Sequence, residues 1–279
     1  MPGYELIGNE EFKEIQNLFK DSGILFRHGF DALRNKIYKV RDFEKNFAEK
    51  MGVSDALAVS SGTAALKVAL KALGIGPGDE VITQAFTFVA TVEAIVEVGA
   101  KPVIANIDES LNISPIDLTR KITAKTKAII AVHMLGIPCD MDNVMKIARK
   151  NNIKVIEDTA WGCGGNYRGK PLGSIGDIGT FSFDFAKTIT TGEGGMIIAK
   201  EDKVLEMAKA YHDHGHENNP KFPRWEDSRS SSGFNYRMTE MQGAVGLAQL
   251  KKLDQVISAH QKHKKALIKK IENLPISFR

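Results

Sequence analysis

The sequence predicts an α/β fold built around a mostly parallel β-sheet. Short, almost continuously apolar runs such as AIIAVH and VIED are typical of strands that are buried on both faces. Between residues 53 and 158 these runs alternate with helical segments, which favours parallel βαβ units. The chain has 279 residues, of which 43% are apolar and 26% charged, and this is enough for a sizeable core.

The predicted elements follow one another in a regular order. Two helices, Glu10–Lys20 and Val40–Lys50, are expected in an N-terminal segment, residues 1–50. Residues 51–249 are expected to form one large domain. Its alternating part comprises, in chain order, helix Thr63–Leu73, strand Glu80–Thr83, helix Phe88–Val98, strand Pro102–Ile107, helix Pro115–Ile122, strand Ala128–His133, helix Met141–Asn151 and strand Lys154–Glu157.

The pattern changes after Asp158. The glycine-rich stretch 162–177 indicates turns and a hairpin, and DIGTFSFDF and GMIIA are further strand candidates. A long helix is expected over roughly Met238–Asn273, with an apolar stripe on one side and lysines on the solvated side. Residues 250–279 are assigned mainly to this helix.

Ligands of parallel sheets bind at the carboxyl ends of the strands, so the polar residues that follow the strands are the ones of interest. The cluster Ser60-Ser61-Gly62-Thr63 opens a predicted helix. The free N–H groups at a helix N-terminus bind phosphate readily. A plain N-cap needs the same residue types, and for this cluster alone the plain cap is the simpler interpretation.

Two carboxylates, Glu157 and Asp158, end the predicted strand KVIED. An acid at this position can pair with a protonated ring nitrogen, as it does in pyridoxal phosphate sites. A helix cap or a turn carboxylate is an equally good interpretation of these two residues alone.

Lys187 stands in FSFDFAKTITTGEGG, a stretch of mostly apolar and small residues. A partly buried lysine has a lowered pKa and can attack an aldehyde. An exposed lysine at the end of a strand is the alternative. Ser182, five residues earlier, can supply a hydroxyl to a phosphate. A phosphate cradle, a ring-nitrogen acid and a nucleophilic lysine, in this order on an α/β chain, together indicate a pyridoxal phosphate site.

The net charge, the cysteines and the lack of long apolar runs say less about the function. The net charge of +4 is too small to indicate nucleic acid and suits anionic small ligands. The two cysteines, Cys139 and Cys163, are too few for a disulfide framework and are expected to be buried thiols. No apolar run is long enough to span a membrane, and no signal peptide is visible. We therefore expect a cytoplasmic protein.

The sequence resembles the DegT/DnrJ/StrS sugar aminotransferases, which are fold-type I pyridoxal phosphate enzymes. The resemblance covers nearly the whole chain. The stretches that carry it are SSGTAAL, TFVATVEAI, GAKPVIANID, VIEDTA, GSIGDIGTFSF, AKTITTGEGG and GFNYRMTEMQGAVGLAQL, of which the last three are the most specific.

The resemblance implies a role for each matching residue. Lys187 matches the lysine that holds pyridoxal 5'-phosphate as a Schiff base, and Asp158 matches the acid on the pyridine nitrogen. Phe88 matches the aromatic side chain on the cofactor ring. The phosphate contacts match Gly62, Thr63 and Ser182. Asn235 matches a residue that reaches the phosphate of the neighbouring subunit, which implies a homodimer with shared active sites.

The sequence departs from the family pattern in two places. Trp161 stands three residues after Asp158, where the family usually has glutamine near the phenolic oxygen of the cofactor. An indole N–H donates one hydrogen bond and accepts none. We therefore expect Trp161 to lie against the cofactor and to donate to this oxygen; an aromatic side chain packed under the loop is the alternative. Family members also usually continue into a small C-terminal domain, which is expected to be largely missing after residue 279. We expect such a chain to bind the cofactor and to turn over poorly on its own.

A narrower resemblance links MPGYELIG, FRHGFDALRNKIYKVRDFE and HDHGHE to the transaminases that make the 8-amino form of the acidic sugar Kdo. It implies that Arg27 binds an acidic acceptor sugar, since arginine binds carboxylates in a bidentate manner; a surface arginine is the alternative. The histidines His212, His214 and His216 can line one face of a strand, but no carboxylate or cysteine accompanies them. We therefore expect no metal, and a loop near the mouth of the active site.

The function expected from these residues is transfer of an amino group, with glutamate as the donor, to a keto or aldehyde sugar for cell-surface polysaccharide or lipopolysaccharide synthesis. Lys187 then also acts as general acid and base. One alternative is a sugar dehydratase; family members of that kind carry histidine in place of the lysine. The other is a non-catalytic scaffold or regulator, against which Lys187 and Asp158 argue.

Overall fold

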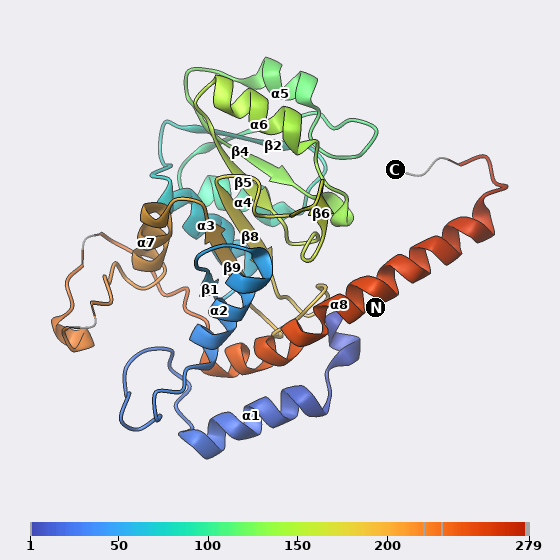
Figure 1. Cartoon of the computed structure of the whole chain (residues 1–279). Coiled ribbons are helices and arrows are strands. Elements are labelled where there is room, and N and C mark those ends of the chain that lie inside the picture. Colours follow the sequence, from blue (N-terminus) through green and yellow to red (C-terminus); the bar gives the residue numbers. More distant parts are fainter. Residues whose placement is uncertain (1, 220, 230, 277–279) are drawn as a thin grey trace.

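A seven-stranded β-sheet forms the centre of the computed structural model, which describes residues 2–219, 221–229 and 231–276 (Figure 1). Its strand order is β1-β9-β8-β5-β4-β2-β3. The strands are β1 (Leu57–Val59), β2 (Glu80–Gln84), β3 (Lys101–Ala105), β4 (Thr126–Val132), β5 (Lys154–Asp158), β8 (Ile178–Ser182) and β9 (Gly195–Ala199). A small hairpin, β6 (Asn166–Tyr167) with β7 (Lys170–Pro171), lies apart from this sheet.

The mostly parallel sheet predicted from the sequence is confirmed. Strands β8, β5, β4, β2 and β3 pair in parallel, whereas β9 is antiparallel to both of its neighbours. The sequence analysis gave no direction for GMIIA and did not identify β1 as a strand. An apolar run does not reveal its direction, because both faces of a central strand are buried in either orientation.

Eight α-helices surround the sheet in the described part of the chain. They are α1 (Asn9–Asp21), α2 (Lys39–Met51), α3 (Gly62–Ala72), α4 (Val89–Glu97), α5 (Pro115–Lys121), α6 (Met141–Lys150), α7 (Asp202–Tyr211) and α8 (Glu240–Ile271). Short 3-10 turns are η1 (Gly3–Leu6), η2 (Met134–Gly136) and η3 (Arg224–Glu226). All the predicted helices are present to within one or two residues, and α7 is the one that the sequence analysis missed.

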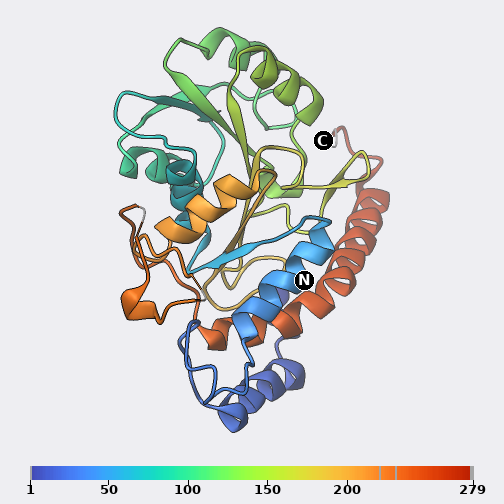
Figure 2. The same cartoon turned by 60° about the vertical axis from the view of Figure 1, so that its left-hand side comes forward.

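The helices form a layer on each face of the sheet. Side chains of α3, α4 and α7 pack on one face in a single hydrophobic cluster with alternate strand residues such as Ile130 and Ile156. On the other face, α5 and α6 cover β2, β3 and β4, while α2 and α8 cover β1, β9 and β8. Helix α2 lies along the first half of α8 in both views (Figure 2).

The N-terminal segment shares its core with the rest of the chain. Phe43 and Phe47 of α2 stack against Phe181 and Phe183 of the sheet, and Leu250 of α8 belongs to the same cluster. Residues from all three expected segments, 1–50, 51–249 and 250–279, therefore meet in one cluster. The boundaries at 50 and 250 stay predictions.

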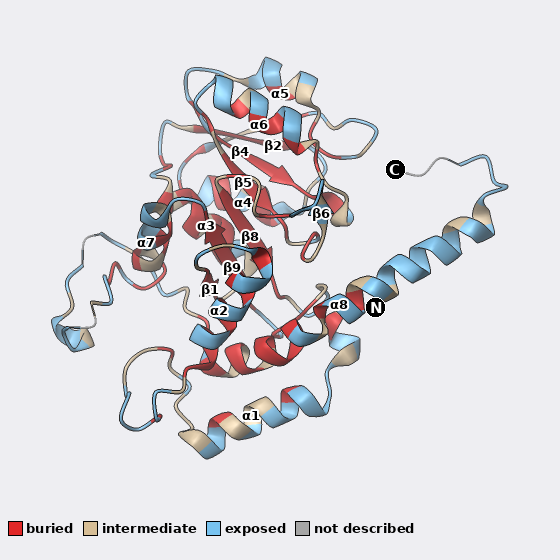
Figure 3. Ribbon diagram, in the orientation of Figure 1, coloured by how far each residue is buried: buried red, intermediate tan, exposed pale blue. Residues whose placement is uncertain are grey.

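Helix α8 changes character along its length. Leu253 and Val256 are buried, whereas Leu267 in the distal part of the helix and Leu274 just beyond its end are exposed (Figure 3). The stripe of apolar residues predicted for this helix is thus buried only in its first half. No helix in the described residues is both long and apolar enough to cross a bilayer.

Candidate active site

A cavity of about 260 Å³ opens at the carboxyl ends of β4, β5 and β8 and at the N-terminus of α3. Parallel sheets usually bind ligands at this edge. Eight of the residues that line it are Gly62, Thr63, Phe88, Thr91, Asp158, Trp161, Ser182 and Lys187. Seven of these eight are the site residues predicted from the sequence; Thr91 is the addition.

The N-terminus of α3 forms one wall of the cavity. The side chain of Ser61 caps the helix by accepting a hydrogen bond from the Ala64 N–H at 3.0 Å. The plain capping role considered for this cluster is therefore real. The N–H groups of Gly62 and Thr63 lie in the first turn of the helix, where no helical carbonyl can accept a hydrogen bond from them.

Gly62 allows this helix end to lie close to β8. A Cβ atom on Gly62 would lie 2.7 Å from Cβ and 3.0 Å from Oγ of Ser182. Only glycine therefore brings the helix amides and the Ser182 hydroxyl together. Amides at a positive helix end beside a hydroxyl are a suitable donor set for a phosphate group.

Asp158 ends β5 and is buried. Its Oδ2 accepts a hydrogen bond from the Thr91 hydroxyl at 2.9 Å, and its Oδ1 accepts one from the Ala160 N–H at 3.2 Å. Burial raises the pKa of Asp158, and these hydrogen bonds together with the positive charge of Lys187 only partly oppose the shift. A buried carboxylate of this kind is stabilised in its charged form by a cationic partner.

Lys187 lies on the loop that follows β8 and is half-buried. Its Nζ lies 3.8 Å from the centroid of the Trp161 ring, a cation–π contact. Burial lowers the pKa of Lys187, and the nearby Asp184 and Asp158 offset part of that shift. A lowered pKa increases the share of neutral amine, which is the nucleophilic form.

Trp161 and Phe88 supply the aromatic surfaces of the cavity. Trp161 is 37% exposed and Phe88 is 62% exposed, so both rings are open to a ligand. The hydrogen bond from the Trp161 indole to a phenolic oxygen of the cofactor stays a prediction. The acid, lysine, hydroxyl and aromatic groups together fit pyridoxal phosphate.

Arg27 and Asn235 do not reach this cavity in the described chain. Arg27 is buried, and its guanidinium binds the Ala58 carbonyl and Glu44, each at 2.8 Å. Asn235 is exposed in the excursion, the mostly irregular segment 212–239 between α7 and α8. There its backbone forms an isolated β-bridge with Asp213. Their roles toward an acceptor and toward a neighbouring subunit stay predictions.

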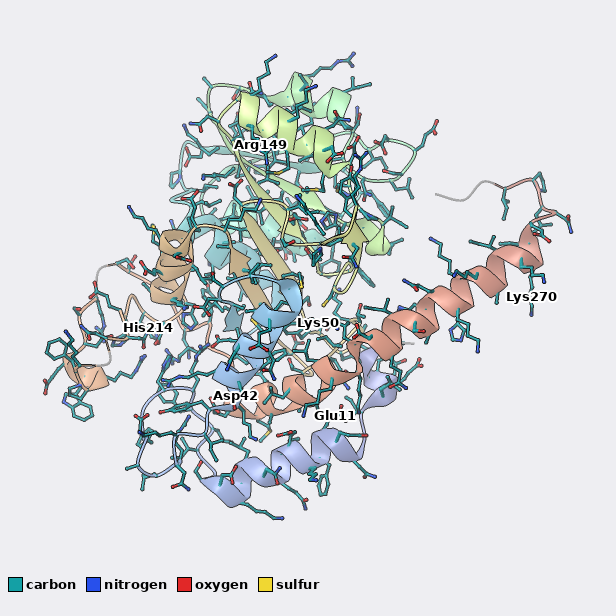
Figure 4. The ribbon with its side chains drawn as sticks, in the orientation of Figure 1. Glu11, Asp42, Lys50, Arg149, His214 and Lys270 are labelled. Carbon is teal, nitrogen blue, oxygen red and sulfur yellow. The ribbon has the colours of Figure 1, made fainter. Side chains whose placement is uncertain are left out.

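The three histidines lie at the end of α7 and in the turn after it, not along one face of a strand. His212 is buried with its Nδ1 on the Lys209 carbonyl, and His216 is buried beside Asp227. His214 is exposed and points away from the sheet (Figure 4). None of them lines the cavity around Lys187, and the expected place of their loop near its mouth stays a prediction. The described residues contain no group of three or more side chains suited to a metal ion.

Sequence reasoning missed Thr91 and the pair His133 and Glu157. Thr91 follows Phe88 by three residues, one helical turn, and this spacing was the available signal. Glu157 was considered together with Asp158, but it turns inward: its carboxylate accepts hydrogen bonds from His133 at 2.9 Å and from the N–H groups of residues 173, 175 and 176. Glu157 therefore holds the hairpin loop and Asp158 alone faces the cavity.

The sequence matches one protein family over most of its length. Residues 31–279 match the DegT/DnrJ/EryC1/StrS aminotransferase family. The chain belongs to this family of sugar aminotransferases, whose fold is that of the pyridoxal phosphate-dependent enzymes.

Two individual members of this group show how far the similarity extends along each chain. The GDP-perosamine synthase of Caulobacter vibrioides is 44% identical over 222 residues, which are 79% of this chain and 58% of the relative. A solved aminotransferase from Psychrobacter cryohalolentis is 38% identical, with a TM-score of 0.81 over 89% of this chain and 63% of its own. The chain therefore spans less than two thirds of the length of these relatives.

A further solved relative bears on the cofactor. The sugar aminotransferase Spr1654 from Streptococcus pneumoniae, in its PLP form, is 28% identical, with a TM-score of 0.80 over 89% of this chain and 65% of its own. The same protein was also solved in a PMP form. A family with these two forms implies pyridoxal phosphate as the cofactor.

Proposed function

We propose that this protein is a pyridoxal phosphate-dependent sugar aminotransferase that moves an amino group from glutamate to a keto or aldehyde sugar. The observation that carries this proposal is the meeting of Lys187, Asp158 and the α3 N-terminus in one cavity. The GDP-perosamine synthase supports a nucleotide-linked sugar as acceptor, and a 41% identical relative from Bacillus subtilis, the spore coat polysaccharide biosynthesis protein SpsC, supports a role in polysaccharide synthesis. The narrower sequence resemblance points instead to an 8-oxo sugar acid.

Lys187 and Asp158 have defined chemical roles in this proposal. The Lys187 amine condenses with the aldehyde of the cofactor: a C=N bond forms and one water leaves. Pyridoxal phosphate supplies the electron sink for the amino-group transfer. Asp158, held by Thr91 and Ala160, keeps a positive charge on the ring nitrogen. Lys187, once released, moves the proton between the two carbon positions that exchange it.

We also propose that the protein acts as a homodimer, with Asn235 reaching the phosphate site of the partner subunit. The exposure of Asn235 in an excursion that does not contribute to its own cavity supports this assignment. In the same way, Arg27 is proposed to bind the acceptor, although its contacts with Glu44 and Ala58 would first have to loosen. A cytoplasmic location fits the soluble family.

Lysine at position 187 separates this proposal from the dehydratase alternative, because that alternative has histidine there. The scaffold alternative gives no reason for a lysine with a lowered pKa beside a buried acid in one cavity.

The test is the first half-reaction. The purified protein is loaded with pyridoxal phosphate, glutamate is added, and the spectrum of the cofactor and the release of 2-oxoglutarate are followed together. A stoichiometric change in both is expected, and it should be absent in Lys187→Ala. The product of the half-reaction is then offered nucleotide-linked keto sugars and an 8-oxo sugar acid. No release of 2-oxoglutarate by the loaded protein would contradict the proposal.

A further inference from the structure

The loop that carries Lys187 is fastened from outside the cavity by the start of the chain. The Gly3 N–H donates a hydrogen bond to the backbone carbonyl of Lys187 itself, at 2.9 Å. Gly3 is buried. A Cβ atom there would lie 2.6 Å from Gln249 Oε1, 2.8 Å from Ile189 Cα and 3.0 Å from the Thr188 carbonyl. The contact thus depends on the lack of a side chain at position 3.

A buried glutamine of α8 binds the same loop three residues further along the chain, at Thr190. Gln249 is 1% exposed. Its Oε1 accepts a hydrogen bond from the Thr190 N–H at 3.2 Å, and its Nε2 donates to Glu11 Oε1 at 2.9 Å. A single side chain therefore links the Lys187 loop to helix α1.

Glu11 completes the connection. It is 2% exposed, and its carboxylate accepts hydrogen bonds from Lys252 and from the Gly8 N–H, each at 2.8 Å. Burial raises the pKa of Glu11, but the hydrogen bonds from Lys252, Gly8 and Gln249 outweigh it, so the net pKa is lowered. A charged, fully partnered carboxylate in this position fixes the geometry of its neighbours.

We propose that residues 3–11, together with Gln249 and Lys252, form an N-terminal latch that positions Lys187 for bond formation with the cofactor. The latch contacts the backbone at residues 187 and 190, and none of its own residues lines the cavity. Its residues are positioning residues. The inference rests on the proposed function, in which Lys187 forms a covalent bond.

The latch acts on one step and leaves another unchanged. Reversible docking of pyridoxal phosphate depends on the α3 N-terminus, Ser182 and Asp158, none of which the latch contacts. Bond formation depends on where the loop holds Lys187 Nζ. Loosening the latch should therefore slow covalent attachment without weakening reversible docking, and a misplaced reacting group lowers the rate steeply.

Two substitutions and two matched controls test this. Gly3→Ala removes the close approach, and Gln249→Leu removes both hydrogen bonds of that side chain. Gly76→Ala is the control for the first, because it lies outside the latch and a Cβ there would make only ordinary contacts, 3.8 Å from the Val98 carbonyl and 3.9 Å from Lys71 Nζ. Gln255→Leu is the control for the second: it makes the same change at an exposed position of α8.

Cofactor-free protein is mixed with pyridoxal phosphate, and borohydride is added at intervals to trap the covalent bond. Reversible affinity is measured by equilibrium dialysis with pyridoxamine phosphate, which has no aldehyde to react. The trapping rate should fall roughly tenfold in both test variants and stay at the wild-type value in both controls, with reversible affinity unchanged throughout. Wild-type trapping rates in both test variants would overturn the latch, as would equal losses of trapping and reversible affinity.

Hydrogen exchange of the cofactor-free protein provides a second measurement. The Thr190 amide should exchange roughly tenfold faster in Gln249→Leu than in wild type, with the amides of α6 unchanged. Unchanged exchange at Thr190 would contradict the latch. If the wild-type protein traps no cofactor, the proposed function is wrong, and exchange at Thr190 alone decides whether the latch holds the loop. Because the two substitutions remove different contacts, either variant that folds is sufficient.

Discussion

The cavity around Lys187 and the excursion between α7 and α8 both carry residues that the sequence singles out, but different forces hold them. The cavity is built where buried strands end, so Asp158 and Ser182 are placed by the hydrophobic core of the sheet. Most of the excursion lies outside that core, and Figure 1 shows it as irregular chain with one short helical turn. Ion pairs around a buried carboxylate hold it in place.

Asp213 is the centre of the excursion. It is fully buried, and it binds Arg224 at 2.6 Å and Arg237 at 2.5 Å, while His28 Nε2 lies 3.2 Å away. Burial would raise the pKa of Asp213, but the surrounding His28 and Arg224 hold it far below its usual range. The position of a residue at the end of a strand can be predicted from the sequence of that strand. The position of a residue in this excursion depends instead on partners elsewhere in the chain.

Removal of Asp213 should have the largest effect on stability. Asp213→Ala leaves two arginines without their common carboxylate, and unfolding should become easier by about 3 kcal/mol. Denaturant titration measures this. Asp254→Ala is the control: its ion pair with Lys50 is exposed, so about 1 kcal/mol or less should be lost. If Asp213→Ala also abolished covalent binding of the cofactor, the two regions would not be independent.

Asp158→Asn should separate chemistry from folding in the other region. The amide cannot hold a positive charge on the ring nitrogen, so the rate of the glutamate half-reaction should fall by at least about a hundredfold. Thermal unfolding should change little, because the remaining oxygen can still accept from the Ala160 N–H while the new amide N–H can donate to the Thr91 hydroxyl. The half-reaction is followed by single-turnover absorbance. A rate within threefold of wild type would remove Asp158 from the proposed role.

The last effect concerns pH, and it is absent at neutral pH. Burial lowers the pKa of His28 to about 4, and the nearby Asp213 offsets this only in part. An unfolded histidine binds its proton near pH 6.5. Between about pH 6.5 and 4 the unfolded chain therefore holds more protons at this site, and stability should fall on acidification. The loss is at most about 1.4 kcal/mol per pH unit.

The measurement is the unfolding free energy of wild type and His28→Gln at several pH values. The difference between the two should be constant above pH 7 and change steadily below pH 6.5. A difference that is constant down to pH 4 would show that His28 takes up its proton in the folded protein.

The same contrast explains what the sequence could predict. Parallel strands bring their carboxyl ends to one edge, so Gly62, Asp158, Ser182 and Lys187 were expected together, and they line one cavity. The antiparallel direction of β9 was not predictable from an apolar run. The pairing of Arg27 with Glu44 and the latch between Gly3 and Lys187 join segments far apart in the chain, and no local pattern specifies such contacts.

The central claim is that Lys187 is the residue that bonds to the cofactor. The most direct test is to reduce the complex with pyridoxal phosphate by borohydride, digest the protein and locate the label by mass spectrometry. The account predicts one label per chain, on Lys187, and none in Lys187→Ala. A label distributed over surface lysines, or one that persists unchanged in Lys187→Ala, would contradict it.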